Sequence, residues 1–465
     1  VKKNDLLTKK IAESFGIKKF VFIENENFLK KIYYLIKAFN LVSYKNIEHK
    51  LIKIKYNGHE VGKSAYEHYL RFHNMKFDKK DKFLLFICLA NALQTLNNAA
   101  EIFKKKYKFF VLGETQFIPN KLLFHYSLKS NVPVYTYFGS SSINFIGRIY
   151  NSYKERNSSS LKFSKKLSNL LLKIFKNKKI IIQSNKKKFL KLIGKETVWS
   201  SYKRRKNLNF KNREKFQEYF KFNPKKKNVL FLPHAMADNL YNSEWNLFKT
   251  SYEWFCKTLD EIKTIDNVNW LIKPHPYEYK FPGVTAREIF SKFEIKKENI
   301  FFLDESIHIN EIYKFVDVVL TGNGSAGYEY TCLGIPVITT SDAKYSNFNF
   351  TIAPKNQESY FKLLNKINLI KKPSKNSMRK AQIYWSALDN IICNSHKFLP
   401  RINQHGKFKK ELFFKKLSKK KLSLNNKNSF SKDILFQLSN KNRHSINYNL
   451  IEKYHKKYSF YLKDI

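Results

Sequence analysis

A histidine between two prolines stands directly after a short apolar run, in the segment Lys273-Pro274-His275-Pro276 that follows Trp270 to Ile272. The run is typical of a buried strand, and ligands bind at the carboxyl ends of strands in open α/β sheets. Because proline restricts φ on either side, the imidazole is held in one direction, as a phosphate or leaving-group contact requires. Lys273 and His275 are therefore candidate donor-binding residues, where the donor is a substrate that gives up a group attached to its phosphate. The alternative is a turn histidine that hydrogen-bonds only its own backbone.

The glycine-rich turn 321–327, Thr-Gly-Asn-Gly-Ser-Ala-Gly, follows another predicted strand and opens a short helix. Gly322 and Gly324 let backbone N–H groups approach a ligand, and Ser325 suits the N-cap of the helix, where phosphate is favoured. Glu329 stands one helical turn later, in a position to accept hydrogen bonds from ribose or sugar hydroxyls. The alternative is a turn that only allows close packing of helix and strand.

A third candidate is the segment Leu232-Pro233-His234-Ala235-Met236-Ala237-Asp238, which follows the first strand of the second half. We expect His234 to contact the phosphate of a donor and Asp238 to orient that phosphate or a hydroxyl; a structural role for either residue stays open. All three candidates follow strands of one predicted sheet, so we expect them to converge on one cleft.

The elements that must position these residues form a βαβα pattern between about Asn228 and Thr340. The predicted strands are Val229 to Leu232, Trp270 to Ile272, Ile300 to Leu303, Val318 to Leu320 and Pro336 to Thr339. Segments long enough for crossover helices separate them. The pattern predicts a parallel sheet with helices on both faces.

The first half repeats the pattern less cleanly and predicts a second α/β domain around a long helix, Lys82 to Lys106. Its predicted strands are Phe20 to Ile23, Leu51 to Ile54, Phe109 to Leu112, Val132 to Tyr137 and Lys179 to Gln183. After about Pro354 the pattern is helical, with Tyr360 to Ile370 and Met378 to Cys393 as predicted helices. Residues 406–429 have the spacing of a basic amphipathic helix.

These patterns divide the chain into an N-terminal α/β domain (1–205), a linker (206–227), a second α/β domain (228–370), closing helices (371–405) and a basic helical tail (406–465). Pro224, after a Lys-, Arg- and Asn-rich stretch, marks the end of the linker's helical part.

Composition indicates a folded protein, with 465 residues, 43% hydrophobic residues and 16% aromatic residues. The net charge of +51 has two interpretations: compositional drift of surface lysines, or a basic face that holds the protein near anionic lipid or an acidic glycan. A non-enzymatic nucleic-acid-binding protein is supported by charge alone, because Lys is dispersed, Arg is scarce and no binding module is present.

The four cysteines are scattered without a C-x-x-C pair, which favours a reducing compartment. The first residues lack the apolar core of a signal peptide, so export is not expected. The best apolar run, Phe83 to Leu93, is too short to span a membrane and predicts a buried core helix.

Taken together, the KPHP turn, the glycine and serine turn followed by Glu329, and the segment Leu333-Gly334-Ile335-Pro336-Val337-Ile338 resemble GT-B glycosyltransferases of bacterial capsule and surface-polysaccharide biosynthesis. The resemblance covers about 228–340. It implies an α/β, GT-B-like fold with two Rossmann-like domains facing across a cleft and a helical C-terminal extension. The histidine–proline motif is similar to that of sialyltransferases and Kdo transferases, whose His and Ser residues hold the phosphate of a CMP-activated acidic sugar. In that family two adjacent hydroxyl residues are frequent, whereas here Gly324 precedes Ser325.

The resemblance implies that the N-terminal half brings the acceptor and a general base, which inverting glycosyl transfer needs near the attacking hydroxyl. Glu114 is the first candidate because it follows the strand Phe109 to Leu112. Glu60 and His59, in a glycine-bracketed loop, are the others. No D-x-D motif is present, and GT-B enzymes as a class do not generally need a metal, so we expect neither metal nor cofactor.

The predicted function is transfer of a sugar from a nucleotide donor, with a CMP-linked acidic sugar expected, to a glycan or lipid-linked acceptor. A CDP-polyol phosphotransferase of the teichoic-acid type is the enzymatic alternative, since it resembles the same fold and carries a KPHP-like turn. We expect a bacterial, cytoplasmic protein, peripheral on the inner face of the membrane through its basic C-terminal tail, and no nucleic-acid partner.

Overall fold

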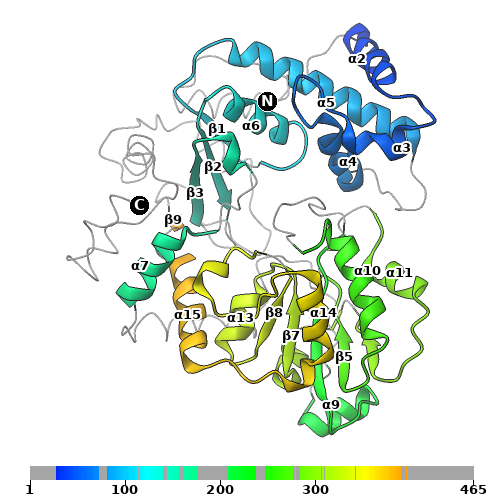
Figure 1. Ribbon diagram of the computed structural model, residues 1–465, viewed down its shortest axis with the longest axis vertical. Coiled ribbons are helices and arrows are strands. Elements are labelled where there is room, and N and C mark those ends of the chain that lie inside the picture. The colour runs from blue at the N-terminus through cyan, green and yellow to red at the C-terminus, as the bar shows by residue number, and fades with distance from the viewer. Residues whose placement is uncertain are drawn as a thin grey trace, which may run out of the picture.

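The computed structural model describes residues 28–72, 81–113, 115–139, 144–156, 162–175, 208, 210–236, 247–275, 278, 283–304, 306–307, 309–340, 342–388 and 393–395 (Figure 1). Its strands form one sheet of five strands and one of four. The predicted strands 20–23 and 179–183 and the predicted basic tail 406–465 lie outside these residues.

The five-stranded sheet is parallel throughout and has the order β6-β5-β4-β7-β8. Its strands are β4 (Lys227–Leu232), β5 (Val268–Ile272), β6 (Ile300–Phe302), β7 (Val318–Thr321) and β8 (Val337–Thr339). All five were predicted from sequence. The central strands are buried on both faces, which is why their sequences are mainly apolar rather than alternating, with Asn228 and Asn269 as buried exceptions.

Helices pack against both faces of this sheet, as Figure 1 shows. They are α10 (Ser251–Ile262), α11 (Ala286–Lys292), α12 (Ile309–Ile312), α13 (Ala326–Cys332) and α14 (Gln357–Asn365), with the 3₁₀ turns η4 (Tyr313–Phe315) and η6 (Ile367–Leu369). Side-chain caps define where several begin: the Thr250 hydroxyl accepts a hydrogen bond from the backbone N–H of Glu253, and Thr285 forms a capping box with Glu288.

The predicted linker 206–227 contains α9 (Arg213–Tyr219), which packs on the five-stranded sheet's second hydrophobic cluster through Phe216. Arg213 holds the Asp317 carboxylate with both guanidinium Nη atoms, at 3.1 and 2.5 Å. The last part of this segment is therefore attached to the second sheet. The division of the chain into domains stays a prediction.

Residues 28–103 are helical, which differs from the predicted α/β pattern. The elements are α2 (Phe28–Leu41), α3 (Ile47–Lys50), the 3₁₀ turn η1 (Leu51–Lys53), α4 (Val61–Phe72) and α5 (Lys82–Phe103). The predicted strand Leu51 to Ile54 was wrong. The segment forms a helical turn against Gly62, where a Cβ atom would lie 1.7 Å from the Leu51 carbonyl oxygen, so this tertiary contact decides its conformation.

The predicted long helix is confirmed as α5 and packs among α2, α4 and α6 (Asn120–Lys129). By length and composition α5 is apolar enough to cross a membrane, contrary to the expectation drawn from the shorter run Phe83 to Leu93. However, 61% of its most apolar window is buried inside the structure, as in the core helix of a folded domain.

The four-stranded sheet is mixed, with β1 (Phe110–Leu112), β2 (Val134–Gly139), β3 (Asn144–Tyr150) and β9 (Cys393–Ser395). The first two were predicted and are parallel, whereas β3 and β9 were missed and pair antiparallel. The predicted helix Met378 to Cys393 ends earlier, as α15 (Lys375–Ser386), and Cys393 belongs to β9.

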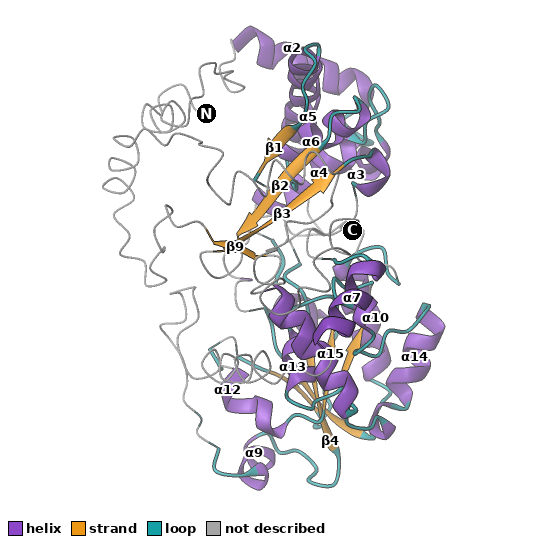
Figure 2. Cartoon of the chain, turned by 90° about the vertical axis from the view of Figure 1, so that its left-hand side faces the viewer, coloured by secondary structure: helices purple, strands orange, loops and turns teal. Residues whose placement is uncertain are grey.

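The C-terminal part of the described chain therefore packs against parts of both halves. Strand β9 pairs with β3 (Figure 2). The ring of Tyr384 of α15 contacts Phe163, just before α7 (Lys165–Phe175), and Phe348 of η5 (Ser346–Phe348). The remaining short element is η2 (Tyr153–Glu155). Segments far apart in sequence thus form one hydrophobic cluster.

Candidate functional site

The candidate site lies at the carboxyl edge of the five-stranded sheet, where the strand order changes direction. The chain runs from β4 outward through β5 and β6, and then returns to β7 on the other side of β4. In open α/β sheets such a reversal of strand order marks the usual ligand position, at the carboxyl ends of the strands.

The three sequence motifs follow the three central strands: His234 follows β4, Lys273 to His275 follow β5, and 322–325 follow β7. Neighbouring strands are about 4.8 Å apart, so the ends of β5 and β7 are separated by roughly 10 Å across β4. The prediction that these motifs share one edge of one sheet is confirmed. Their roles toward a donor stay predictions.

The two histidines of the edge lie side by side. The ring centroids of His234 and His275 are 6.1 Å apart, with 28° between the ring planes. The backbone N–H of Lys273 donates to the Phe231 carbonyl oxygen at 2.9 Å, which extends the β4–β5 pairing up to the KPHP turn. The hydrogen bonding between β4 and β5 thus reaches Lys273, which is only 6% exposed.

His275 is uncharged at neutral pH. Burial lowers its pKa to about 3, and the neighbouring charges of His234 and Lys273 act in the same direction. A neutral imidazole has one N–H donor and one ring nitrogen acceptor. His275 can therefore donate a single hydrogen bond to a phosphate oxygen, while the buried Lys273 ammonium supplies positive charge.

Ser325 occupies the N-cap position of α13, as predicted, but its side chain makes no capping hydrogen bond. Its hydroxyl instead hydrogen-bonds the Glu329 side chain one turn later. Burial raises the pKa of Glu329, and Ser325 and Lys344 partly oppose that shift. Ser325 and Glu329 thus form one polar unit beside the glycine turn.

The glycines of the turn have different roles. A Cβ atom on Gly327 would lie 1.9 Å from the Tyr345 hydroxyl oxygen, so this glycine is required for packing. The same hydroxyl donates to the Gly324 carbonyl oxygen at 3.0 Å and fixes the turn. A Cβ atom on Gly324 would lie 3.3 Å from the Thr321 hydroxyl oxygen and 4.0 Å from the Ala326 backbone nitrogen, so it is far less restricted than one on Gly327. The packing interpretation of the glycine turn therefore holds for Gly327.

Sequence reasoning missed several polar residues at this edge. Asn323 is 8% exposed within the glycine turn, and the hydroxyls of Thr339 and Thr340 are buried without a hydrogen-bond partner among the described residues. Thr321 and Thr339 are register partners at the ends of β7 and β8. The sequence signal for Thr321 and Thr339 was a threonine at the carboxyl end of each of these two strands. The general preference of threonine for strands explains those positions equally well.

Of the predicted general bases, the structure describes His59 and Glu60. Glu114, like Asp238 of the donor site, is outside the described residues. His59 is the last residue of the turn 56–59, and Glu60 follows it. This turn contacts the last turn of α6, where the rings of His59 and Tyr126 stack with centroids 5.2 Å apart. Since α6 runs back from the carboxyl end of β1 to the start of β2, its last turn lies toward the amino edge of that sheet. His59 and Glu60 are thus placed away from the strand end that precedes Glu114.

Among the described ranges of the chain, no group of three or more His, Cys, Asp or Glu side chains is arranged to hold a metal ion. Cys88, Cys256 and Cys332 are free thiols. Metal independence stays a prediction.

No protein-family model matches the chain, and no curated protein matches it. Among solved structures, it is similar to KpsC, beta Kdo 2,7 transferase, of Thermosulfurimonas dismutans, with 16% identity and a TM-score of 0.33, covering 62% of this chain and 80% of that chain. It is also similar to KpsC, beta Kdo 2,4 transferase, of the same organism, with 11% identity and a TM-score of 0.34, covering 62% of this chain and 85% of that chain. Kdo transferases are the class that the sequence motifs resemble. Because both TM-scores are below 0.5, we infer the function of this protein from its site residues.

Proposed function

We propose that the protein is a nucleotide-sugar-dependent glycosyltransferase of surface-polysaccharide biosynthesis, with the leaving nucleotide held at the carboxyl edge of the five-stranded sheet. The observation that carries the proposal is the juxtaposition of His234 and His275, 6.1 Å apart, at the point where the strand order reverses. The His275 imidazole and a buried lysine ammonium at one sheet edge are donors for phosphate oxygens, and the imidazolium form of His234 adds a third donor.

Within this proposal each group has a role in departure of the nucleotide. The His275 N–H and the backbone N–H groups of the turn 322–325 hydrogen-bond the phosphate, and Lys273 stabilises the negative charge that grows as the glycosidic bond breaks. The Nδ1–H of His234 donates to the Ala235 carbonyl oxygen at 3.0 Å, so His234 donates to the phosphate through Nε2 only as the imidazolium. Glu114 removes the proton of the attacking acceptor hydroxyl. No metal is needed for this charge balance. A CMP-linked acidic sugar is the proposed donor.

The test is binding of CMP, CDP, UDP and GDP to the full chain, measured by thermal shift and calorimetry, because a ligand that binds only the folded state raises the melting temperature. Preferential stabilisation by CMP supports the proposed donor. Stabilisation by UDP or GDP alone would overturn the cytidine assignment, and stabilisation by none would overturn the nucleotide site. Transfer of glycerol phosphate from CDP-glycerol would instead identify the polyol phosphotransferase.

We further propose that the protein docks on the anionic inner face of the cytoplasmic membrane, and α2 supports this. The helix presents Phe28, Leu29, Tyr33 and Ile36 at 73%, 68%, 56% and 55% exposure, and it carries three lysines and no acidic residue. Sedimentation with phosphatidylglycerol and phosphatidylcholine vesicles tests the proposal. Selective binding to the anionic vesicles, lost in the double variant Leu29→Ser with Ile36→Ser, is expected; equal binding of the variant would contradict it.

A further inference from the structure

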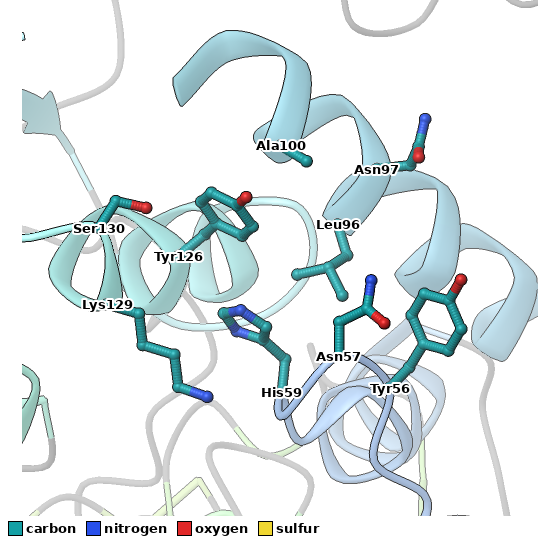
Figure 3. A pocket seen from close by; sticks show the side chains of 9 residues that line it. All are labelled: Tyr56, Asn57, His59, Leu96, Asn97, Ala100, Tyr126, Lys129 and Ser130. Carbon is teal, nitrogen blue, oxygen red and sulfur yellow. The ribbon is translucent and has the colours of Figure 1, made fainter. Parts of the chain in front are cut away.

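A separate hollow of about 210 Å³ lies between α5, α6 and the turn 56–59, away from the carboxyl edge described above (Figure 3). This volume is below the range of ~300–1,000 Å³ that is typical for drug-sized ligands. A nucleotide is too large for it, whereas one small polar molecule is not.

The turn that forms one wall is conformationally fixed. Tyr56 and His59 exchange backbone hydrogen bonds of 3.0 and 2.9 Å, and Asn57 and Gly58 between them have φ angles of +48° and +72°. Asn-Gly is the pair that tolerates positive φ at both central positions of such a turn. Lys129 of α6 also donates to the Gly58 carbonyl oxygen. The wall is therefore formed before any ligand arrives.

His59 provides a buried polar group to this hollow. It lines the hollow, is 4% exposed, and its Nδ1 atom has no hydrogen-bond partner among the described residues. Burial and the charge of Lys129 lower its pKa to about 4, so at neutral pH the ring is uncharged. Figure 3 shows its ring beside Tyr126, with Leu96 of α5 across the hollow.

The rest of the lining combines neutral polar groups with one cation. Asn57 and Asn97 contribute amides at the rim, Lys129 contributes an ammonium, and Leu96 and Ala100 provide apolar surface. No carboxylate occurs among the described lining residues. Amides, hydroxyls and a neutral imidazole match sugar hydroxyl groups, and a lysine matches one negative charge.

We propose that this hollow is a binding site for a small polyhydroxylated anion, an acidic sugar unit. The negative charge can come from a carboxylate or from a phosphate, and both are held by the same ammonium. The proposal does not depend on the nucleotide site, because the two sites share no residue.

The experiment is calorimetric titration of the full chain with glucuronate, glucose 6-phosphate, glucose and acetate, up to about 20 mM, a range that includes millimolar dissociation constants. Glucuronate or glucose 6-phosphate, or both, should bind more tightly than glucose, and acetate should not bind measurably. The stronger of the two anionic sugars identifies the source of the charge. Absence of binding by every sugar would overturn the proposal.

Variants separate this site from non-specific attraction to a basic protein. Lys129→Met should weaken binding of the anionic sugar by about tenfold or more, the effect of losing a charge-assisted hydrogen bond, and leave glucose affinity within about twofold. Asn97→Ala should weaken anionic and neutral sugars alike. Lys105→Met, which removes an exposed charge outside the hollow, is the matched control. If Lys105→Met weakened binding as much as Lys129→Met, the attraction would be non-specific and the proposal wrong.

Discussion

Replacing His275 by alanine tests the proposed nucleotide site most directly. The imidazole is half-buried beside His234 and uncharged at neutral pH, because its pKa is lowered to about 3. The substitution should therefore remove one hydrogen bond from a neutral donor to a charged phosphate, which contributes about 1.5–3 kcal/mol. That range corresponds to a dissociation constant about 10- to 150-fold weaker.

The assay is calorimetric titration of wild type and His275→Ala with CMP, at a temperature well below the melting temperature of both proteins. His125→Ala is the matched control, because burial likewise lowers the pKa of His125 to about 3, but His125 belongs to α6 in the first half of the chain. Binding by the control should stay within about twofold of wild type. If His275→Ala also binds within twofold, or if both variants weaken equally, the imidazole does not contact the nucleotide and the assignment of the site is wrong.

Three further predictions concern catalysis, packing and pH. Glu114→Gln should lower kcat by roughly 10²–10⁴ while nucleotide affinity, measured in parallel, stays nearly constant; near-normal turnover would place the base elsewhere. Gly327→Ala should lower the free energy of unfolding, measured in denaturant titrations, by about 1–3 kcal/mol, because the added methyl group would contact Tyr345. An unchanged midpoint would show that the Tyr345 ring moves to make room for the methyl group. Because the folded protein keeps His125 and His275 neutral while the unfolded chain gains protons below about pH 6.5, stability should fall as pH drops from 6.5 toward 3. His125→Phe should flatten that slope by up to about 1.4 kcal/mol per pH unit, and an unchanged slope would argue against a neutral buried imidazole.

The local sequence determined the five-stranded sheet. Strands buried on both faces are mostly apolar, so β4, β5 and β7 contain short continuous apolar runs whose ends are marked by proline or glycine turns. The buried Asn228 and Asn269 are exceptions, and their side chains hydrogen-bond each other at 2.9 Å. The same runs located His234, His275 and the turn 322–325, because a residue directly after a parallel strand lies at the carboxyl edge whatever the strand order is.

The first half was predicted less well because its local patterns are ambiguous. Leu51 to Ile54 has the composition of a strand, but Leu51 lies against Gly62 in a helical turn. Strand β9 stands in a segment with helical periodicity, and its pairing with β3 joins residues about 250 positions apart. The β3–β9 pairing lies far outside the window from which periodicity is determined, and the contact between Leu51 and Gly62, although only eleven positions apart, is a backbone contact that apolar periodicity does not report.

The amino-acid sequence by itself determined which side chains carry chemistry and that they follow strands. Only the tertiary structure decided that β5 and β7 flank β4, which brings the rings of His234 and His275 to 6.1 Å. It also decided that the Tyr345 hydroxyl holds the glycine turn, and that His59 lines a hollow between two helices instead of the carboxyl edge of a sheet. The physical reason is that strand order, burial and the resulting pKa values depend on contacts between distant segments, whereas propensity and turn chemistry depend on near neighbours in the chain.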